Sequence, residues 1–230
     1  MYHKGGVRYE PLALPDRVGL SDAEALAKAQ AHLAYMRKRH SVRQFSTEPV
    51  SAEIIAACIA TAGTAPSGEN HQPWHFVAIG NPEMKQKIRL AAEEEERAFY
   101  SGGGGDEWLA ALEPIGTGVE KPHLTDAPWL IVVFAQKFGM TLDGVKYKNY
   151  YVPESVGIAT GFLISALHNA GLVCLEHTPN PMKFLNELCG RPANEKPVMI
   201  LPVGHPALDA TVPAVAKRKK PLGDILTLLP

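Results

Sequence analysis

Few cysteines and no excess of either charge narrow the classes to which this sequence could belong. The 230 residues include three cysteines, which are far apart and form no CxxC pair. This pattern argues against a disulfide framework or a structural zinc site and favours a reducing compartment, so we expect a cytoplasmic protein. Lys and Arg number 23 against 24 Asp and Glu, whereas a nucleic-acid-binding protein normally has a basic excess. We therefore expect no nucleic-acid partner.

Targeting signals and long apolar runs are also missing. The first 20 residues contain no apolar segment typical of a secretory signal. The longest apolar stretch, 155–175, is interrupted by His168 and Asn169, so it predicts a buried helix rather than a membrane span. Residues 1–20 hold two prolines and no hydrophobic period. We expect them to form an N-terminal arm that either is disordered or packs on a partner subunit through Val7, Tyr9 and Leu12.

The motifs of several common enzyme classes are absent too. No GxGxxG follows a predicted strand, and the four glycines at 102–105 are not followed directly by a helical pattern. There is no P-loop, no HExxH and no GxSxG, and the nine histidines show no metal-ligand spacing. An enzyme with this sequence would therefore take its reactivity from a cofactor, and we expect no metal site.

What is present is an alternation of helical and strand patterns in a chain that is 46% hydrophobic. Helices are predicted from Ser21, where a capping box begins, from Ser51, from Asn81 toward Tyr100, and over 153–170 and 181–189. Strands are predicted at 74–79, 129–134, 172–175 and 198–201. This alternation predicts a fold in which helices cover a sheet. The least regular segment, 102–126, predicts a mobile excursion over a site.

A basic cluster precedes the second predicted helix. Residues 37–43 place five potentially cationic side chains and the Ser41 hydroxyl within seven positions. One interpretation is a solvated helix end, where basic residues complement the helix dipole. The other is a phosphate clamp, because guanidinium groups and hydroxyls donate to phosphate oxygens. A second basic run, 217–220, is by itself typical of a solvated tail.

A polar, turn-rich segment leads into the first predicted strand. Residues 66–74 read Pro-Ser-Gly-Glu-Asn-His-Gln-Pro-Trp. The small residues let a flat ring approach the backbone, and the amide side chains can pair with the polar edge of a heterocycle. The segment therefore supports the interpretation of residues 37–43 as a phosphate clamp.

Together, the two segments resemble the nitroreductase superfamily of FMN enzymes. The motifs are Arg39-x-Ser41-x-Arg43 and Pro66-Ser67-(x)2-Asn70-x-Gln72-Pro73-Trp74. Further segments at 61–68, 87–100, 170–179, 190–196 and 201–206 resemble one branch, the iodotyrosine deiodinases, so that the likeness spans about residues 37–222. It implies an α+β, nitroreductase-like fold, with a central mixed β-sheet covered by helices, in an intertwined homodimer. Residues 21–230 would form one FMN-binding domain, with a lid at about 100–125.

The resemblance assigns residues to the cofactor. It implies that Arg39, Ser41 and Arg43 hold the phosphate and ribityl end of FMN, with Arg218 arriving from the C-terminal region. Ser67 and Gly68 would line the flavin, and Asn70 would reach its pyrimidine edge. The remaining residues expected at the cofactor are His40, Pro66 and His177. Thr178 matches the threonine whose hydroxyl approaches flavin N5 and suits one-electron steps. The alternative interpretation is a helix N-cap before Pro179 and Pro181, and both roles could hold at once.

The resemblance also assigns residues to the substrate. Glu96, Tyr100 and Lys121 match the residues with which deiodinases hold the amino-acid end of a halotyrosine. Glu96 and Tyr100 are four residues apart and share one helix face. The alternative is that the acidic run is only a solvated face. The implied reaction is reductive dehalogenation to tyrosine under a lid that excludes water, with backbone N–H groups near Gly68 and Glu69 stabilising the substrate phenolate.

Four positions depart from the deiodinase pattern. His40 stands where arginine is common, which weakens the phosphate clamp slightly. Glu69 stands where a small residue usually lies beside the phenolate, Asn70 is closer to general nitroreductases, and Glu176 is unexpected near a flavin. A broad NAD(P)H-dependent nitroreductase or quinone reductase is therefore the alternative function, and a non-catalytic flavin- or amino-acid-binding protein is a third. Electrons could come from NAD(P)H directly or through a separate reductase.

Overall fold

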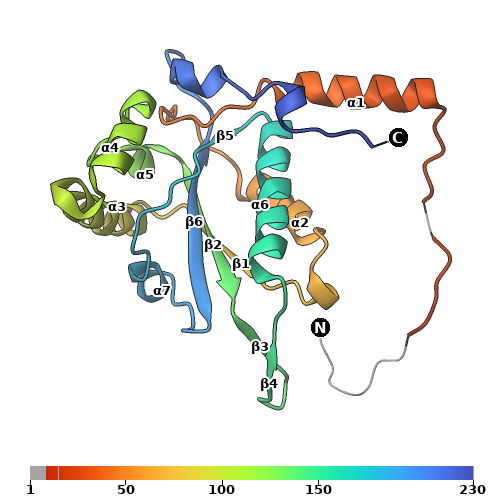
Figure 1. Ribbon diagram of the computed structural model, residues 1–230. Coiled ribbons are helices and arrows are strands. Elements are labelled where there is room, and N and C mark those ends of the chain that lie inside the picture. Colours follow the sequence, from red (N-terminus) through yellow and green to blue (C-terminus); the bar gives the residue numbers. More distant parts are fainter. Residues whose placement is uncertain (1–8, 15, 230) are drawn as a thin grey trace.

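The computed structural model describes residues 9–14 and 16–229 (Figure 1). Part of the expected N-terminal arm, including Val7, lies outside these residues. Its described part, 9–14 and 16–20, has no regular secondary structure and is exposed in the single chain. No helix within the described ranges is long and apolar enough to cross a bilayer.

Four antiparallel strands form the central sheet. β1 (Trp74–Ile79) pairs with β2 (Trp129–Gln136), β2 pairs with β6 (Glu195–Gly204), and β6 pairs with β5 (Val173–Cys174). The parallel component of the expected mixed sheet is confined to a single bridge between Ser41 and Cys174. A separate hairpin, β3 (Phe138–Met140) with β4 (Lys146–Lys148), was not predicted.

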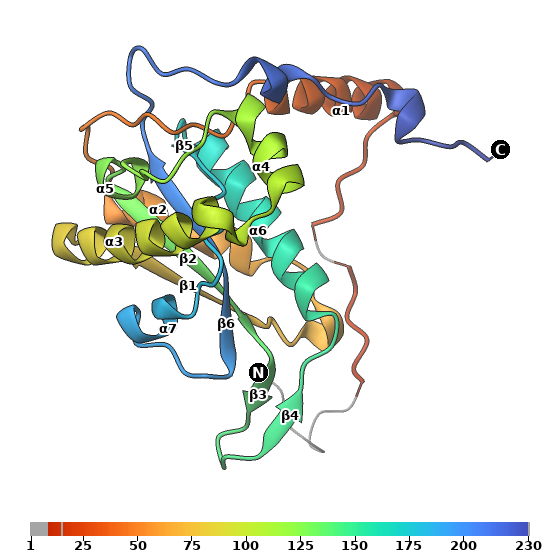
Figure 2. The same cartoon turned by 60° about the vertical axis from the view of Figure 1, so that its left-hand side comes forward.

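Helices cover both faces of this sheet (Figures 1 and 2). Successive β2 side chains point to opposite faces, as in any strand. Ile131 and Val133 pack with α2 (Ala52–Gly63) and α6 (Val152–Asn169) on one face. Leu130 and Val132 pack with α3 (Pro82–Ala98), α5 (His123–Asp126) and α7 (Phe184–Leu188) on the other. Burial on both faces explains why β2 is an unbroken apolar run.

Local sequence signals set several helix ends. Ser21 and Glu24 form the predicted capping box of α1 (Asp22–Met36). The Asn81 Oδ1 atom accepts a hydrogen bond from the Met84 N–H at 2.8 Å, which starts α3. Gly171, with φ of +78°, follows α6 as predicted. In contrast to the other long helices, α1 buries none of its residues within the single chain.

The segment after α3 is more regular than predicted. α3 continues into a π-helical turn at Phe99–Gly103 and is followed by α4 (Asp106–Leu112), a 3-10 turn at Glu113–Ile115 and α5. The helix predicted over 181–189 is shorter and begins at Phe184. Further 3-10 turns lie at Gly68–Asn70, Ala214–Lys217 and Leu222–Asp224.

Candidate functional site

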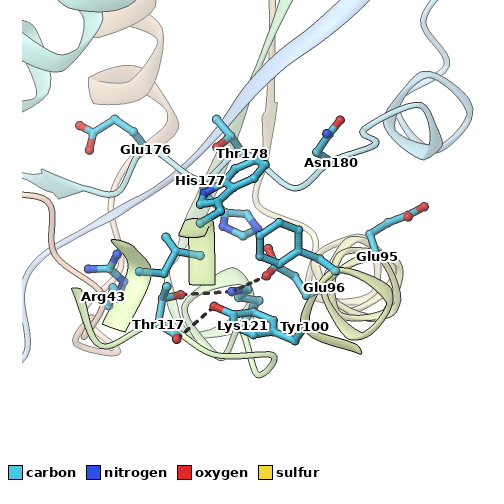
Figure 3. Close-up of a pocket in the computed structure, with 13 residues that line it drawn as sticks. Arg43, Glu95, Glu96, Tyr100, Thr117, Lys121, Glu176, His177, Thr178 and Asn180 are labelled. Carbon is cyan, nitrogen blue, oxygen red and sulfur yellow. Dashed lines mark hydrogen bonds and ion pairs between the residues drawn. The ribbon is translucent and has the colours of Figure 1, made fainter. Parts of the chain in front are cut away.

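A cavity lies between α3 and the segment that follows β5 (Figure 3). Its volume is about 180 Å³. Glu96 reaches it from α3, whereas Arg43, Glu176 and Thr178 approach from the other side. Lys121 also lines the cavity and lies close to Glu96. Residues far apart in the sequence therefore meet at one site.

Lys121 is the buried charge of this cavity. Its Nζ atom lies 3.1 Å from Glu96 Oε2, with side chains that are 3% and 14% exposed. The same ammonium donates to the Gly118 carbonyl at 2.5 Å and to Thr117 Oγ1 at 3.2 Å. A buried ammonium is stable only when its donors are engaged in this way.

The acidic run on α3 divides into buried and exposed carboxylates. Glu93 Oε1 accepts a hydrogen bond from the Lys121 backbone N–H at 2.8 Å and from Arg89 Nε at 2.7 Å. Burial acts to raise the pKa of Glu93, but these hydrogen bonds outweigh it and the pKa is lowered. Glu94, by contrast, is 76% exposed and pairs with Arg97. The solvated-face interpretation therefore holds for Glu94 and fails for Glu93 and Glu96.

Aromatic side chains cover the same cavity. The Tyr100 hydroxyl donates to the Thr117 carbonyl at 3.1 Å, and its ring centroid lies 5.9 Å from Lys121 Nζ. Phe99 packs edge-on against Trp108, with ring centroids 4.8 Å apart. A Cβ at Gly104 would lie only 2.5 Å from the Phe99 ring, so the glycine run allows the chain to pass closely over this ring.

The basic cluster converges on Glu176. The Ser41 hydroxyl donates to the Glu176 carboxylate, and Arg39 Nη1 lies 3.6 Å from Glu176 Oε1. Burial lowers the pKa of Arg43, and the nearby Glu176 carboxylate opposes that shift. Burial, followed by Arg39, Lys217 and Lys219, lowers the pKa of His40. The C-terminal basic run therefore lies near the cluster, with Arg218 exposed in the run.

Thr178 presents an open hydroxyl. The side chain is exposed, lines the cavity and makes no hydrogen bond within the described part of the chain. The N-cap of α7 is Lys183, so the alternative interpretation of Thr178 as a helix N-cap is wrong. The preceding residue, His177, exchanges backbone hydrogen bonds with Ile200 of β6, which fixes the position of the segment against the sheet.

His177 and His123 form a buried imidazole pair. Their ring centroids are 5.2 Å apart, and neither Nε2 atom has a hydrogen-bond partner in the described chain. Burial first, and then neighbouring positive groups including Lys121 and Arg43, lower the pKa of each to about 3. Both rings are therefore neutral at pH 7 and add no positive charge beside the lysine.

The loop at 66–70 does not line this cavity. Ser67 Oγ accepts a hydrogen bond from the Gln72 N–H at 2.9 Å, and the Gly68 N–H donates to Ser155 Oγ, near the start of α6, at 3.3 Å. Exposed Glu69 and Asn70 have φ of 49° and 55°. Pro66, which was also expected at the cofactor, is exposed as well.

Within one chain, therefore, the two predicted halves of the cofactor site, the basic cluster and the loop at 66–70, lie apart. Arg39 and His40 share a cavity with His168, near the end of α6, whereas Gly68 bonds Ser155 near its start. Thirteen residues of helix correspond to about 20 Å at 1.5 Å per residue. Figure 1 shows one end of α6 near β5 and α1 and the other end toward the β3–β4 hairpin.

Several residues in or beside the cavity were not predicted. Thr117 and Gly118 hold Lys121, Trp108 covers the cavity, and His123 packs on His177. Glu93 had a usable signal, because it is three residues from Glu96 on the same helix face. The sequence contains no local signal that would have indicated the other residues. Within 9–14 and 16–229, no group of three or more His, Cys, Asp or Glu residues is placed to hold a metal ion.

This chain is similar to several known proteins. The family model described as "Nitroreductase family" matches residues 36–205. An iodotyrosine deiodinase of Haliscomenobacter hydrossis is 49% identical over 197 residues, covering 86% of this chain and 89% of the relative. Iodotyrosine deiodinase 1 of Homo sapiens is 44% identical over 206 residues, covering 89% and 71%. A crystal structure of oxidized iodotyrosine deiodinase bound to FMN and 3-iodo-L-tyrosine is 32% identical, with a TM-score of 0.67, covering 76% of this chain and 90% of that one.

Proposed function

This chain belongs to the nitroreductase family, and we propose that it is an FMN-dependent enzyme that removes the halogen from halotyrosines. The observation that carries the proposal is the buried Lys121–Glu96 pair in a cavity that Tyr100 also lines. The pair offers one cation and one anion, which match the carboxylate and ammonium of a free amino acid. A simple phenol or nitroaromatic has no such groups.

The residues present fit FMN. Arg39 Nη1 is buried without a hydrogen-bond partner, and a phosphate would supply acceptors for it. Ser41 adds a hydroxyl to the same place. A Cβ at Gly68 would lie 2.8 Å from the Tyr150 carbonyl oxygen, so only glycine keeps this backbone where it is. Thr178 would approach the flavin ring, Arg43 the ribityl end and Arg218 the phosphate. Ser67 and Asn70 would complete the ring site.

The substrate would be held at both ends. Glu96 would receive the ammonium and Lys121 the carboxylate, while the Tyr100 hydroxyl donates to one of the oxygens. Backbone N–H groups at Gly68 and Glu69 would donate to the phenolate. Helices α4 and α5 with the turn at Glu113–Ile115 would act as the lid, and its closure would exclude water and strengthen each polar contact.

The reaction needs two electrons and one proton for each halide released. Reduced FMN, when bound, would supply the two electrons; the carbon–halogen bond breaks, a carbon–hydrogen bond forms, and the products are tyrosine and halide. The chain orients the ring, holds the phenolate oxygen and keeps a hydroxyl donor at Thr178. His123 and His177 remain neutral and do not compete with Lys121 for the substrate carboxylate.

We further propose a homodimer with each FMN at the subunit interface. The separation of Gly68 from Arg39 along α6 supports it, because a second copy can bring the loop at 66–70 to the basic cluster. Exposed apolar side chains also support it. They lie on the arm and α1, on α6, and on the C-terminal segment: Tyr9, Leu12, Leu14, Leu26, Leu33, Ile158, Phe162, Ile225 and Leu228.

The electron source and the compartment complete the proposal. NAD(P)H, directly or through a reductase, would reduce the flavin. The three cysteines are free, and burial raises the pKa of Cys189 to about 11, which keeps the thiol protonated. Free, protonated thiols suit the reducing cytoplasm.

A second candidate, a broad nitroreductase or quinone reductase, is favoured by one observation. Glu69 is exposed next to Asn70, and a carboxylate there would repel a phenolate. Rapid NAD(P)H oxidation with a nitroaromatic acceptor, and no preference for zwitterionic phenols, would support this candidate.

The direct test uses reduced, FMN-loaded protein mixed without oxygen with 3-iodotyrosine. Tyrosine is quantified by chromatography, and 2-iodophenol serves as the substrate control because it lacks the amino-acid end. We expect repeated turnover of iodotyrosine and much slower reaction of iodophenol. A reducible flavin that yields no tyrosine would refute the dehalogenase.

A further inference from the structure

Glu176 places a negative charge in the middle of the basic cluster. Its carboxylate accepts the Ser41 hydroxyl hydrogen bond, and Oε1 lies 3.6 Å from Arg39 Nη1. Cys174 Sγ lies 3.9 Å from the same oxygen. The Glu176 side chain is 26% exposed. The residues expected to receive the cofactor phosphate are therefore already in contact with an acid of the same chain.

The backbone fixes this arrangement. Ser41 and Cys174 form a parallel bridge, and the Val42 N–H donates to the Cys174 carbonyl at 3.0 Å. Glu176 lies two residues beyond the bridge, and its carboxylate contacts the Cys174 thiol, so the two side chains lie on the same side of the segment. It also lines the cavity with Arg43 and Thr178 (Figure 3).

The contact leaves the arginine incompletely satisfied. At 3.6 Å the carboxylate is beyond hydrogen-bond distance of Arg39 Nη1, and that nitrogen is buried with no other partner. A phosphate has more acceptor oxygens and more charge than a carboxylate, so it can satisfy both Ser41 and Arg39. Phosphate and Glu176 cannot both occupy this position, because like charges in contact repel.

We propose that Glu176 is an internal competitor for the phosphate of FMN. This inference rests on the proposed function, and in particular on binding of the phosphate by Arg39 and Ser41. In the FMN-free protein Glu176 occupies the anion position and partly neutralises the cluster. Cofactor binding displaces the carboxylate, which weakens affinity for FMN and leaves affinity for riboflavin, which has no phosphate, unchanged.

The test compares the dissociation constants of FMN and riboflavin, measured by quenching of flavin fluorescence, in the FMN-free wild-type protein and in Glu176→Gln. We expect the variant to bind FMN about tenfold tighter, which corresponds to the loss of one repulsive contact of about 1.4 kcal/mol, and riboflavin as before. Glu48→Gln is the matched control. It removes one negative charge from a side chain that is 66% exposed and lies 3.9 Å from His205 Nε2, so neither flavin should respond.

A thermal measurement checks that Glu176→Gln remains folded. The FMN-free variant should melt no higher than wild type, because the neutral amide loses the charge attraction to Arg39. Saturating FMN should raise its melting temperature more than it raises that of wild type. Unchanged or weaker FMN affinity in the variant would overturn the inference and leave the proposed function standing. Equal tightening of riboflavin would also overturn it, because the effect would not involve the phosphate. Failure of both proteins to bind FMN would refute the proposed function as well.

Discussion

The Nζ atom of Lys121 lies 3.1 Å from Glu96 Oε2, and the side chains are 3% and 14% exposed. Each of them would be costly to bury alone. Together they form a pair with no net charge. When a zwitterion binds, contacts with its ammonium and carboxylate groups can replace part of the attraction between Glu96 and Lys121.

Glu96→Gln should weaken halotyrosine binding by roughly ten- to a hundredfold, because truncating one partner of a buried charge pair costs about 2 kcal/mol or more. FMN should be retained. The measurement is the dissociation constant for 3-iodotyrosine in the oxidised, FMN-loaded protein. Glu94→Gln is the matched control on the same helix, since Glu94 is exposed and pairs only with Arg97 among the described residues. Equal affinities in the two variants would contradict the assignment of Glu96.

Thr178→Ala should keep FMN but slow dehalogenation by roughly ten- to a hundredfold, as expected for loss of one donor at a reacting centre. The reason is that its hydroxyl is free in the described chain and faces the cavity. The measurement is kcat/KM for 3-iodotyrosine, together with the flavin content from absorbance. Thr178→Ser retains the hydroxyl and should restore most of the rate. An alanine variant as fast as wild type would remove Thr178 from the mechanism.

Gly68→Ala should lower the free energy of unfolding by about 1–3 kcal/mol, the usual cost of inserting a methyl group into packed structure. The new Cβ would lie 2.8 Å from the Tyr150 carbonyl oxygen, and backbone cannot yield as a flexible side chain can. Urea unfolding of the FMN-free protein gives the number. Gly63→Ala, where nothing lies within 4 Å of the added carbon, is the control and should be neutral or slightly stabilising.

His123→Phe should flatten the pH dependence of stability. The pKa of His123 is about 3 in the folded chain, against an ordinary value near 6.5. Between these values the unfolded chain binds a proton that the folded chain does not, so the free energy of unfolding falls as pH decreases. The loss approaches about 1.4 kcal/mol per pH unit and histidine, and is absent above pH 6.5. Charged groups that act on this ring are Lys121, Arg43, Arg89 and Glu93.

The measurement for this variant is urea unfolding from pH 7.5 down to pH 5. The phenylalanine fills the same space without a titrating nitrogen, and His177 continues to contribute. The variant should therefore lose stability less steeply than wild type. Parallel curves would show that the imidazole pair does not control acid sensitivity.

Local signals explain how much of the fold could be predicted. Ser21, Asn81 and Gly171 act on neighbouring backbone groups, so their helix ends followed from the sequence alone. The buried run of β2 was equally clear. The β3–β4 hairpin was missed because its strands are three residues each and mostly polar or exposed.

Site residues could be predicted only where they belong to a sequence motif shared with a known family. Arg39, Ser41, Glu96, Tyr100 and Lys121 followed from resemblance, and the last three do meet in one cavity. The contact between Ser41 and Glu176 joins residues 135 positions apart, and no local pattern encodes such a pair. The imidazole pair of His123 and His177 was missed for the same reason.

The division of the predicted FMN site along α6 has a genetic consequence. If one subunit provides Arg39 and its partner provides Gly68, then a chain disabled at Arg39 and a chain disabled at Gly68 are each inactive as homodimers. In the mixed dimer one of the two sites draws Arg39 from the second chain and Gly68 from the first, and so it is intact. Co-expression of the two defective chains should therefore restore activity through intragenic complementation, which a site contained within a single chain cannot produce.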